Sequence, residues 1–235
     1  MKTIKIAHLY YDLMNLYGET GNILALTTAL KRQGVKYTVT ELTKGDKIEF
    51  SKYDIFYMGM GTEKNQSIVL NDIINYQKDI QKVIKKKVFI MTGNSYELFG
   101  LKINDNNALG IFNFVSEKDE KRIVKEQVYK TSFLNNPVIG FQNRGSINNN
   151  EENHLFEIID GNGDNNISIY EGIHIDNFYG TYTVGPLLVR NPHLLDKILK
   201  DYLESCNYTY KEIKDTPEYK AYDKYLENFK INREI

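Results

Sequence analysis

The stretch KVFIMTGNSYELFG, residues 87–100, decides the fold of this chain. It begins with the apolar run 88–91, whose composition is typical of a fully buried strand. A turn follows at Thr92-Gly93-Asn94-Ser95, and residues 96–99 are predicted to begin a helix. A strand, a sharp glycine turn and a helix present one residue at the carboxyl edge of a sheet, as nucleophile elbows and phosphate-binding turns do. The presented residue here is Gly93, which has no side chain with which to attack a substrate.

The composition is that of an ordinary globular protein. The chain has 235 residues, of which 41% are hydrophobic and 26% charged, and a formal net charge of -1. This charge argues against a general nucleic-acid binder. No apolar stretch reaches the roughly 20 residues that a membrane span needs and no signal peptide precedes the first strand, so we expect a cytoplasmic protein. The single cysteine, Cys206, excludes an internal disulfide framework and a Cys-based metal cluster, and we expect no cofactor.

The remaining pattern predicts strands separated by helices. Strands are expected over residues 2–9, 36–42, 54–58 and 179–183, and helices between Thr20 and Gly34, over 67–85, and over 192–204 with Asn191 as cap. In the less regular middle, we expect short strands at 108–115, 127–130 and 138–142, an Asn-rich loop at 143–153 and a turn at 161–165. A final, partly exposed helix is predicted after Lys211.

This order favours an α/β fold of three layers, α/β/α, with a mostly parallel sheet covered on both faces. In such sheets a ligand site lies beyond the carboxyl ends of the strands, where both Gly59-Met60-Gly61 and Thr92-Gly93-Asn94 are expected. We expect residues 1–210 to form one domain and residues 211–235 to be a helical extension of the same domain.

Several short motifs follow one another along nearly the whole chain. Each alone is weak, but their order and spacing are specific: Asp12-Leu13-Met14-Asn15-Leu16-Tyr17, Gly21-Asn22-Ile23, Gly59-Met60-Gly61, Gln66, the elbow, Gly110-Ile111, Gly140-Phe141-Gln142-Asn143, Glu171-Gly172-Ile173-His174 and residues 180–188, GTYTVGPLL. With them the chain resembles the class I glutamine amidotransferases of the cobyric acid synthase type, in particular the GatD-type glutaminase subunit of lipid II isoglutaminyl synthase. The resemblance implies a role in peptidoglycan amidation for the cell wall and a hetero-oligomer with a Mur ligase-like synthetase subunit.

The resemblance also locates two catalytic positions, and neither carries a reactive side chain. Family members that hydrolyse glutamine have a Cys in a pattern like I-C-G-G-Y-Q, which falls on Gly93 when Tyr96 and Gly100 are aligned. Their His, in a pattern like G-T-Y-x-H-G-P, falls on Val184. The reaction needs a thiolate and an imidazole that takes and returns its proton, and losing one member of such a pair costs orders of magnitude in rate. These two positions predict a pseudoenzyme.

Two neighbouring side chains are candidates for a replacement nucleophile. Ser95 and Thr92 flank the turn, but a hydroxyl nucleophile needs a nearby base. The chain has four histidines, His8, His154, His174 and His193, and for each the alternative is a satisfied or solvent-facing ring. Cys206 is expected to be a small buried hydrophobic residue.

Substrate-binding positions are also implied by the resemblance. The Gly59, Met60 and Gly61 amides would help to form an oxyanion hole, and Gln66 and Arg122 would contact the substrate. The alternatives are a tight glycine turn and a solvated arginine. The segment Asn143-Arg144-Gly145-Ser146 stands where family members have a pattern like N-H-x-G, so another His is missing. A retained pocket could bind a small molecule such as glutamine.

Three functions remain open from the sequence. The first is a non-catalytic amidotransferase-like subunit that binds its partner as a scaffold or regulator. The second is an active glutaminase that delivers ammonia through a non-standard nucleophile, and the third is a small-molecule sensor on the same fold. The tyrosines of the C-terminal third, Tyr202, Tyr208, Tyr210, Tyr219 and Tyr222, are expected either to anchor a partner or to cover the core of the chain itself.

Overall fold

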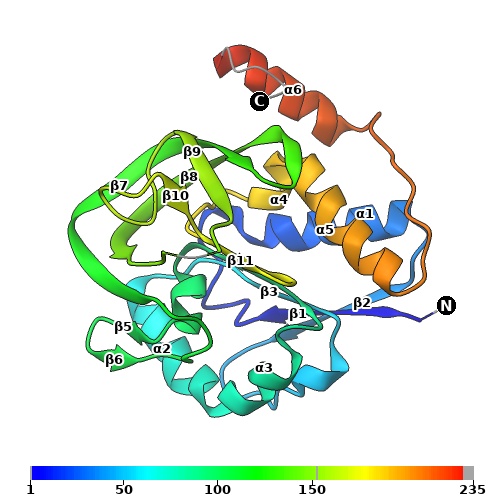
Figure 1. Cartoon of the computed structure of the whole chain (residues 1–235). Helices are drawn as coiled ribbons and strands as arrows, with labels where there is room; N and C mark the ends of the chain where they lie inside the picture. Colours follow the sequence, from blue (N-terminus) through cyan, green and yellow to red (C-terminus); the bar gives the residue numbers. More distant parts are fainter. Residues whose placement is uncertain (1, 152, 230–235) are drawn as a thin grey trace.

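The structure is a computed structural model that describes residues 2–151 and 153–229. Figure 1 shows helices on both faces of a central sheet and a second sheet beside it. The elements are, in chain order, β1 (Ile4–Leu9), η1 (Leu16–Gly18), α1 (Thr20–Arg32), β2 (Tyr37–Leu42), η2 (Phe50–Lys52), β3 (Ile55–Met58), α2 (Glu63–Ile73), η3 (Ile74–Tyr76), α3 (Gln77–Val83), β4 (Val88–Thr92), η4 (Gly93–Phe99), β5 (Lys102–Ile103), β6 (Asn106–Asn107), β7 (Val115–Thr131), β8 (Leu134–Asn148), β9 (Phe156–Asp160), β10 (Tyr170–Glu171), β11 (Ile173–Ile175), β12 (Phe178–Thr181), α4 (Leu187–Arg190), α5 (Pro192–Ser205) and α6 (Pro217–Phe229).

The central sheet has the strand order β11-β12-β4-β3-β1-β2 within the described residues. All neighbouring strands from β12 to β2 are parallel, whereas β11 runs antiparallel to β12. The elbow strand β4 lies between β12 and β3, away from both edges of the sheet. The predicted fold class is therefore confirmed, and Gly93 follows a central strand.

The two faces of this sheet are covered by different helices, and the inner strands alternate between them. Phe56 and Phe89 stack with ring centroids 4.5 Å apart on the face that α2 and α3 cover. Tyr57 and Ile90, the next residues along each strand, pack on the opposite face against α1 and α5. Because β3 and β4 are buried on both faces, they appear in the sequence as continuous apolar runs.

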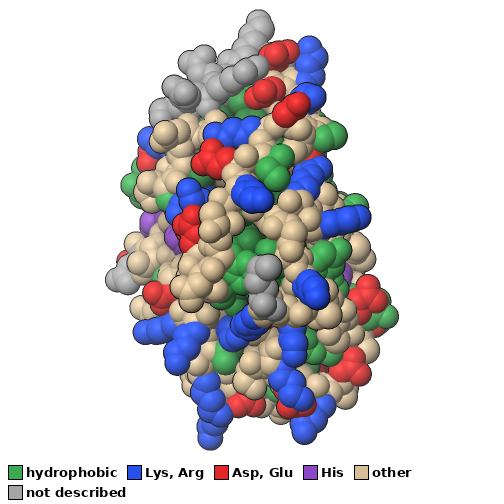
Figure 2. All heavy atoms as spheres, turned by 90° about the vertical axis from the view of Figure 1, so that its right-hand side faces the viewer, with side chains coloured by type: hydrophobic (Ala, Val, Ile, Leu, Met, Phe, Trp, Pro, Cys, Tyr) green, Lys and Arg blue, Asp and Glu red, His purple; other side chains and the backbone are tan. Residues whose placement is uncertain are grey.

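The edge strand β2, unlike β3 and β4, is largely exposed. It pairs with β1 alone among the described strands, and Tyr37 and Val39 are each 36% exposed. Figure 2 shows the side of the molecule that lies to the right in Figure 1, where acidic, basic and hydrophobic side chains are interspersed. The strand thus presents an open edge on a mixed surface.

The second sheet is largely antiparallel and was predicted only in fragments. Its strand order is β10-β9-β7-β5-β6, with β8 paired to β7 along most of their lengths. The predicted short strands at 127–130 and 138–142 are parts of this long β7–β8 hairpin. The predicted loop at 143–153 is wrong in its first half, because β8 continues to Asn148 and pairs there with Ser116. The turn predicted at 161–165 lies outside the strands.

Other local predictions need correction for backbone reasons. The predicted strand at 108–115 is absent, because the amides of Leu109 and Ile111 bond back to carbonyls of η4. The helix predicted over 67–85 is three pieces, and it begins at Glu63 because Thr62 caps the amide of Asn65 (3.1 Å). The helix predicted at residues 96–99 is present as the 3₁₀ helix η4, which already begins at Gly93.

The C-terminal part packs onto the second sheet and α5. Tyr222 and Leu226 of α6 form a small cluster with Val128 and Ile139 of the hairpin. Asn191 is the N-cap residue of α5, as predicted, but its side chain makes no capping hydrogen bond. It exchanges two hydrogen bonds with the backbone of Ile139 instead (2.7 and 2.8 Å). Of the C-terminal tyrosines, Tyr202, Tyr219 and Tyr222 are buried in the packing of this chain, and Tyr208 and Tyr210 are half-buried.

Candidate functional site

Three loops meet at the carboxyl edge of the central sheet. Register pairs Met58 of β3 with Met91 of β4, and Thr92 of β4 with Thr181 of β12. The segments that follow, 59–61, 93–95 and 182–185, therefore begin side by side. The sequence predicted the first two at this edge, and the structure places them there.

Gly93 has the backbone of a residue presented at an elbow, but the space above it is filled. Its φ is +63°, a conformation that side chains rarely adopt. A Cβ at this position would lie 2.5 Å from the Cβ and 2.7 Å from the Cγ of Met60. A larger residue at position 93 would therefore require Met60 to move.

The backbone amide of Gly61 is also occupied. It donates to the side-chain oxygen of Asn94 (3.1 Å), and the Asn94 amide group donates back to the Gly61 carbonyl (3.1 Å). Asn94 stands where family members have a small glycine after the nucleophile position. An amide held in this way is not free to stabilise an oxyanion.

Val184 is fully buried and lies opposite Phe141 in an isolated antiparallel bridge, with its amide donating to the Phe141 carbonyl (2.9 Å).

The hydroxyls of the two candidate replacement nucleophiles, Ser95 and Thr92, are hydrogen-bonded to other groups. The Ser95 hydroxyl donates to the carbonyls of Met58 (2.9 Å) and Thr92 (2.8 Å), and the Thr92 hydroxyl donates to the Glu19 carboxylate. Neither hydroxyl contacts an imidazole in the part of the chain that the structure describes.

The histidines lie apart from these hydroxyls. His174 shares a hydrogen bond with the Phe178 carbonyl (3.0 Å), His154 stacks on Tyr170, and His193 packs edge-on against Tyr219. His8, in β1, is buried, and neither of its ring nitrogens has a hydrogen-bond partner among the described residues. Burial lowers the pKa of His8 to about 4, so its ring is neutral at physiological pH. Cys206 lies directly after α5 and is half-buried.

A buried carboxylate, Glu19, joins β3 and the end of β4 to the loop after β12. It accepts hydrogen bonds from the hydroxyls of Tyr57 (2.6 Å) and Thr92 and from the amide of Gly185 (3.1 Å). Burial raises the pKa of Glu19, and these three donors act in the opposite direction. This role could not be predicted from the sequence, because a single acid before a helix is an ordinary feature of a helix start.

Beyond Met60 lies a cavity of about 520 Å³, which we call the Glu97 cavity. Of the predicted substrate-binding residues, Met60, Gln66 and Arg122 line it, whereas Gly59 and Gly61 do not. Arg122 lies at its mouth, exposed, and contacts Glu63 (3.1 Å) and the side chain of Asn143 (2.6 Å). The cavity is lined by Met60, Glu63, Gln66, Ser67, Leu70, Asn94, Glu97, Ile103, Asn104, Asn106, residues 116–120, Arg122 and residues 144–146.

Glu97 is the residue in this cavity that the sequence reasoning missed. It is 1% exposed and accepts hydrogen bonds from the side chains of Gln66 (2.5 Å) and Ser146. Burial raises its pKa, and the hydrogen bonds from Ser146 and Gln66 lower it. A signal was present, since Tyr96-Glu97 stands where the family pattern has Tyr-Gln.

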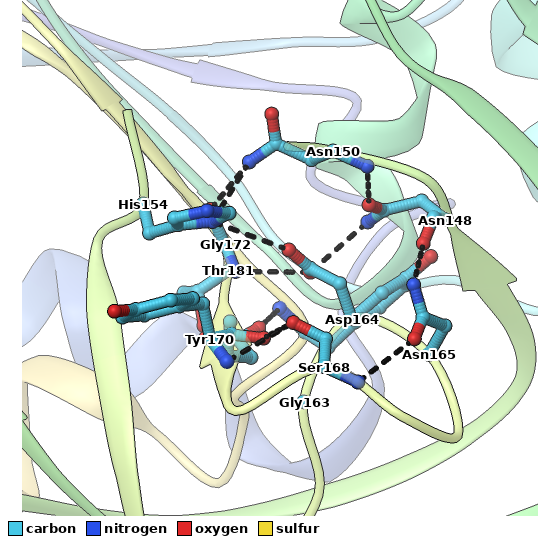
Figure 3. Close-up of polar contacts among 12 residues, drawn as sticks. Asn148, Asn150, His154, Gly163, Asp164, Asn165, Ser168, Tyr170, Gly172 and Thr181 are labelled. Carbon is cyan, nitrogen blue, oxygen red and sulfur yellow. Dashed lines mark hydrogen bonds and ion pairs between the residues drawn. The ribbon is translucent and has the colours of Figure 1, made fainter. Parts of the chain in front are cut away.

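A second buried polar cluster lies behind Tyr182, and Figure 3 shows its Asp164 carboxylate pointing toward Asn148 and Gly172. Asp164 accepts from the Tyr96 hydroxyl (2.9 Å) and the Gly172 amide (3.0 Å). Nearby Glu171 accepts from the Thr181 hydroxyl (2.7 Å) and the Tyr182 amide (2.6 Å). Burial raises the pKa of both acids, and the Asp164 charge raises that of Glu171 further. The cluster fixes the 162–172 segment to the elbow and to the loop after β12.

Arg144 joins this cluster to the Glu97 cavity. Its guanidinium lies 4.0 Å from the centre of the Tyr182 ring and donates to the Gln142 side chain (2.9 Å) and to the carbonyls of Ser146, Gly163 and Asp164. No group of three or more potential metal ligands is found within the described residues. The helices in the described part of the chain include none that is long and apolar enough to cross a membrane.

Comparison of the chain with known proteins matches it to one family. Residues 5–192 match the CobB/CobQ-like glutamine amidotransferase domain. The chain is 28% identical, over 229 residues and 94% of each chain, to the lipid II isoglutaminyl synthase (glutamine-hydrolyzing) subunit GatD of Staphylococcus aureus (strain N315). It is also 28% identical over 212 residues to the subunit of the same name from Streptococcus pneumoniae (strain ATCC BAA-255 / R6), covering 86% of this chain and 81% of that one. A crystal structure of a glutamine amidotransferase superposes with a TM-score of 0.55 at 12% identity, over 84% of this chain and 98% of the other, a likeness of fold alone.

Proposed function

Because this chain belongs to the CobB/CobQ-like glutamine amidotransferase domain family, we propose that it is a non-catalytic, cytoplasmic member of that family that acts in lipid II amidation through a partner subunit. The observation that carries the proposal is the state of the elbow. Gly93 supplies no nucleophile, Met60 fills the space above it, Asn94 holds the Gly61 amide, and Val184 supplies no base. Each of these features removes one requirement of glutamine hydrolysis.

Catalysis is tested by measuring ammonia release from glutamine with purified protein, alone and mixed with the ligase-like partner. We expect no release above background in either case, and no labelling by cysteine-directed glutamine analogues. The matched variant is Ser95→Ala, which removes the strongest hydroxyl candidate. Turnover by the wild type that Ser95→Ala abolishes would establish the alternative, an active glutaminase with a non-standard nucleophile.

The proposed partner is a Mur ligase-like synthetase subunit. Support comes from the relatives, whose names describe them as subunits of lipid II isoglutaminyl synthase. Two proteins that form a stable complex should bury about 1,200–2,000 Å² of surface in total. Co-expression of this chain with the ligase-like protein, followed by size-exclusion chromatography at micromolar concentration, should give one co-eluting peak. Separate elution would reject the complex and favour the small-molecule sensor.

A further inference from the structure

The edge of β2 differs from the other sheet edges in the described part of the chain. The edge strands β6, β10 and β11 are only two or three residues long. The long edge of β8 is covered, because Asn191 bonds to the backbone of Ile139 and the Val184 amide donates to the Phe141 carbonyl. β2 has six residues in continuous register with β1 and contains no proline. Proteins usually shorten or cover an edge of this kind, so its exposure calls for an explanation.

Every second residue of β2 faces the open edge. The carbonyls of Lys36 and Leu42 accept hydrogen bonds from the amides of Ile4 (2.9 Å) and Tyr11 (3.3 Å), so the even-numbered residues face β1. Because backbone groups alternate between the two sides of a strand, the amides and carbonyls of residues 37, 39 and 41 point away from β1. β2 pairs with no other described strand. These groups can therefore receive one further strand.

The side chains of the edge-facing residues continue an apolar row of the core. Tyr37 and Val39 lie beside Ile4 and Ile6 of β1, which are fully buried and pack against α1 and α5. Tyr37 and Val39 themselves are each 36% exposed. The apolar face of the central sheet thus extends beyond the helices that cover it. An added strand would bring its own side chains against these two residues.

The charges of β2 favour a different chain over a second copy of this one. Lys36 and Glu41 are exposed, and neither forms an ion pair with another described residue. In an antiparallel pair, residues opposite each other both face the partner strand or both face away from it. Lys36 faces β1 and Glu41 faces the edge, so two copies of β2 cannot place these charges directly opposite each other. In the symmetric register centred on Val39, Glu41 would stand opposite Tyr37 instead of a cation.

From these observations we infer that the β2 edge binds an extended segment of another protein by antiparallel strand addition, with a lysine or arginine of that segment opposite Glu41. Backbone hydrogen bonds give such a complex its affinity, and alternate side chains give it selectivity. The antiparallel direction is chosen because parallel pairing is slightly less stable per residue. β1 and β3 separate this edge from the elbow strand β4, so the inference goes beyond the proposed function and concerns a different surface.

The test uses two peptides of identical composition, each acetylated and amidated at its ends. Their sequences are Ser-Lys-Thr-Val-Thr-Val-Glu and Ser-Glu-Thr-Val-Thr-Val-Lys. With its central valine opposite Val39, the first peptide places Lys opposite Glu41 and Glu opposite Lys36, whereas the second places like charges at both positions. We expect the first peptide to bind the wild type at least about fivefold more tightly in an NMR titration, because opposite charges stabilise a cross-strand pair and like charges destabilise it.

Hydrogen exchange and N-methylation test the backbone pairing. The amides of residues 37, 39 and 41 should exchange more slowly with the first peptide bound, whereas those of residues 38 and 40, which already face β1, should not change. An N-methyl group on the central valine of the peptide removes a hydrogen bond to Val39 and should weaken binding at least about fivefold. The matched control carries the N-methyl group on the preceding threonine, whose amide points away from β2, and should change affinity by less than about twofold.

Two charge reversals in the protein test the role of Glu41. Glu41→Lys should bind the first peptide at least about fivefold more weakly, because two cations then face each other. Glu120→Lys makes the same change at an exposed position of β7 and should alter affinity by less than about twofold. The peptide comparison uses the wild type alone and stands even if Glu41→Lys fails to fold.

Equal binding of the two peptides, no binding of the first at millimolar concentration, or equal effects of the two N-methyl groups would each overturn the inference. So would a folded Glu41→Lys variant that binds the first peptide as the wild type does. A protein that is already dimeric without peptide, with slow exchange at residues 37, 39 and 41, would show that a second copy covers the edge instead. None of these measurements uses ammonia release or the ligase-like subunit, so the inference and the proposed function can fail separately.

Discussion

At the scale of single residues, Gly93 shows two separate obstacles to restoring a nucleophile. One is its positive φ of +63°, and the other is the contact with Met60. Gly110 provides a matched control, because its φ is +61° but the nearest atom to an added Cβ lies 3.6 Å away. The pair separates backbone strain from crowding.

We therefore predict that Gly93→Cys lowers the free energy of unfolding by about 3 kcal/mol, through strain of about 1 kcal/mol and overpacking of about 2 kcal/mol. Gly110→Cys should lower the free energy of unfolding by the strain contribution alone, about 1 kcal/mol. Adding Met60→Ala to Gly93→Cys should recover part of the loss, as measured by urea unfolding in a double-mutant cycle. Equal losses for Gly93→Cys and Gly110→Cys would show that Met60 does not crowd the position.

His8 is predicted to make stability depend on pH. The unfolded chain binds a proton on this ring below about pH 6.5, whereas burial lowers the folded pKa to about 4. The unfolded state therefore binds more protons between these values, so stability falls as the pH drops from 6.5 to 4, by about 3 kcal/mol at most. In urea unfolding, the stability of His8→Leu relative to that of the wild type should rise as the pH falls across this range. A constant difference between the two proteins from pH 7.5 to 4.5 would contradict the assignment.

Some residues of the candidate site could be predicted from the sequence, and others could not. Gly93, Val184, Gln66 and Arg122 could be singled out because each occupies a position in a motif. Glu19 and Asp164 could not, because their partners are distant in sequence and are brought together only by the sheet order. The functional roles of the first group stay predictions.

At the scale of helices and strands, the burial of a strand decided whether it could be predicted from the sequence. β3 and β4 were predicted because both faces of each are buried, which gives continuous apolar runs. The β7–β8 hairpin was fragmented in the prediction because much of β7 is exposed and polar between residues 117 and 126. Its pairing arises from the partner strand rather than from its own hydrophobic alternation.

Glu19 is expected to be the main connection between the strands β3 and β4 and the loop after β12. Glu19→Ala would leave the Tyr57 and Thr92 hydroxyls and the Gly185 amide without their acceptor, so we predict a loss of about 3 kcal/mol in the free energy of unfolding. Amide hydrogen exchange of Gly185 should accelerate in the same variant. Glu63→Ala, at an exposed ion pair, should change stability by less than about 1 kcal/mol. Unchanged exchange at Gly185 would reject this role for Glu19.

At the scale of the whole molecule, we propose that residues 211–235 belong to the same domain as residues 1–210. The support comes from α6, whose Tyr222 hydroxyl donates to the Pro137 carbonyl (2.6 Å) and whose Leu226 contacts the hairpin. Glu218 also forms an ion pair with Arg32 of α1 (3.0 Å). Residues 230–235 lie outside the described part of the chain.

Truncation after residue 210 should therefore destabilise the remaining chain, because Val128 and Ile139 lose the cover of α6. Burial of about two large side chains corresponds to roughly 4 kcal/mol. Calorimetry should show a lower melting temperature for the truncated protein, and Tyr222→Ala should reproduce part of the decrease. An unchanged melting temperature would indicate an independent appendage.

The open edge of β2 has a consequence for how the protein behaves in concentrated solution. A strand with exposed Tyr37 and Val39, no proline and unpaired backbone groups on one side is a template for edge-to-edge aggregation. Glu41 is exposed on the same strand and places a charge where a second edge would approach. Glu41→Val should remove this gatekeeper and raise light scattering at high protein concentration while leaving the melting temperature nearly unchanged, because the side chain contributes to colloidal solubility rather than to packing.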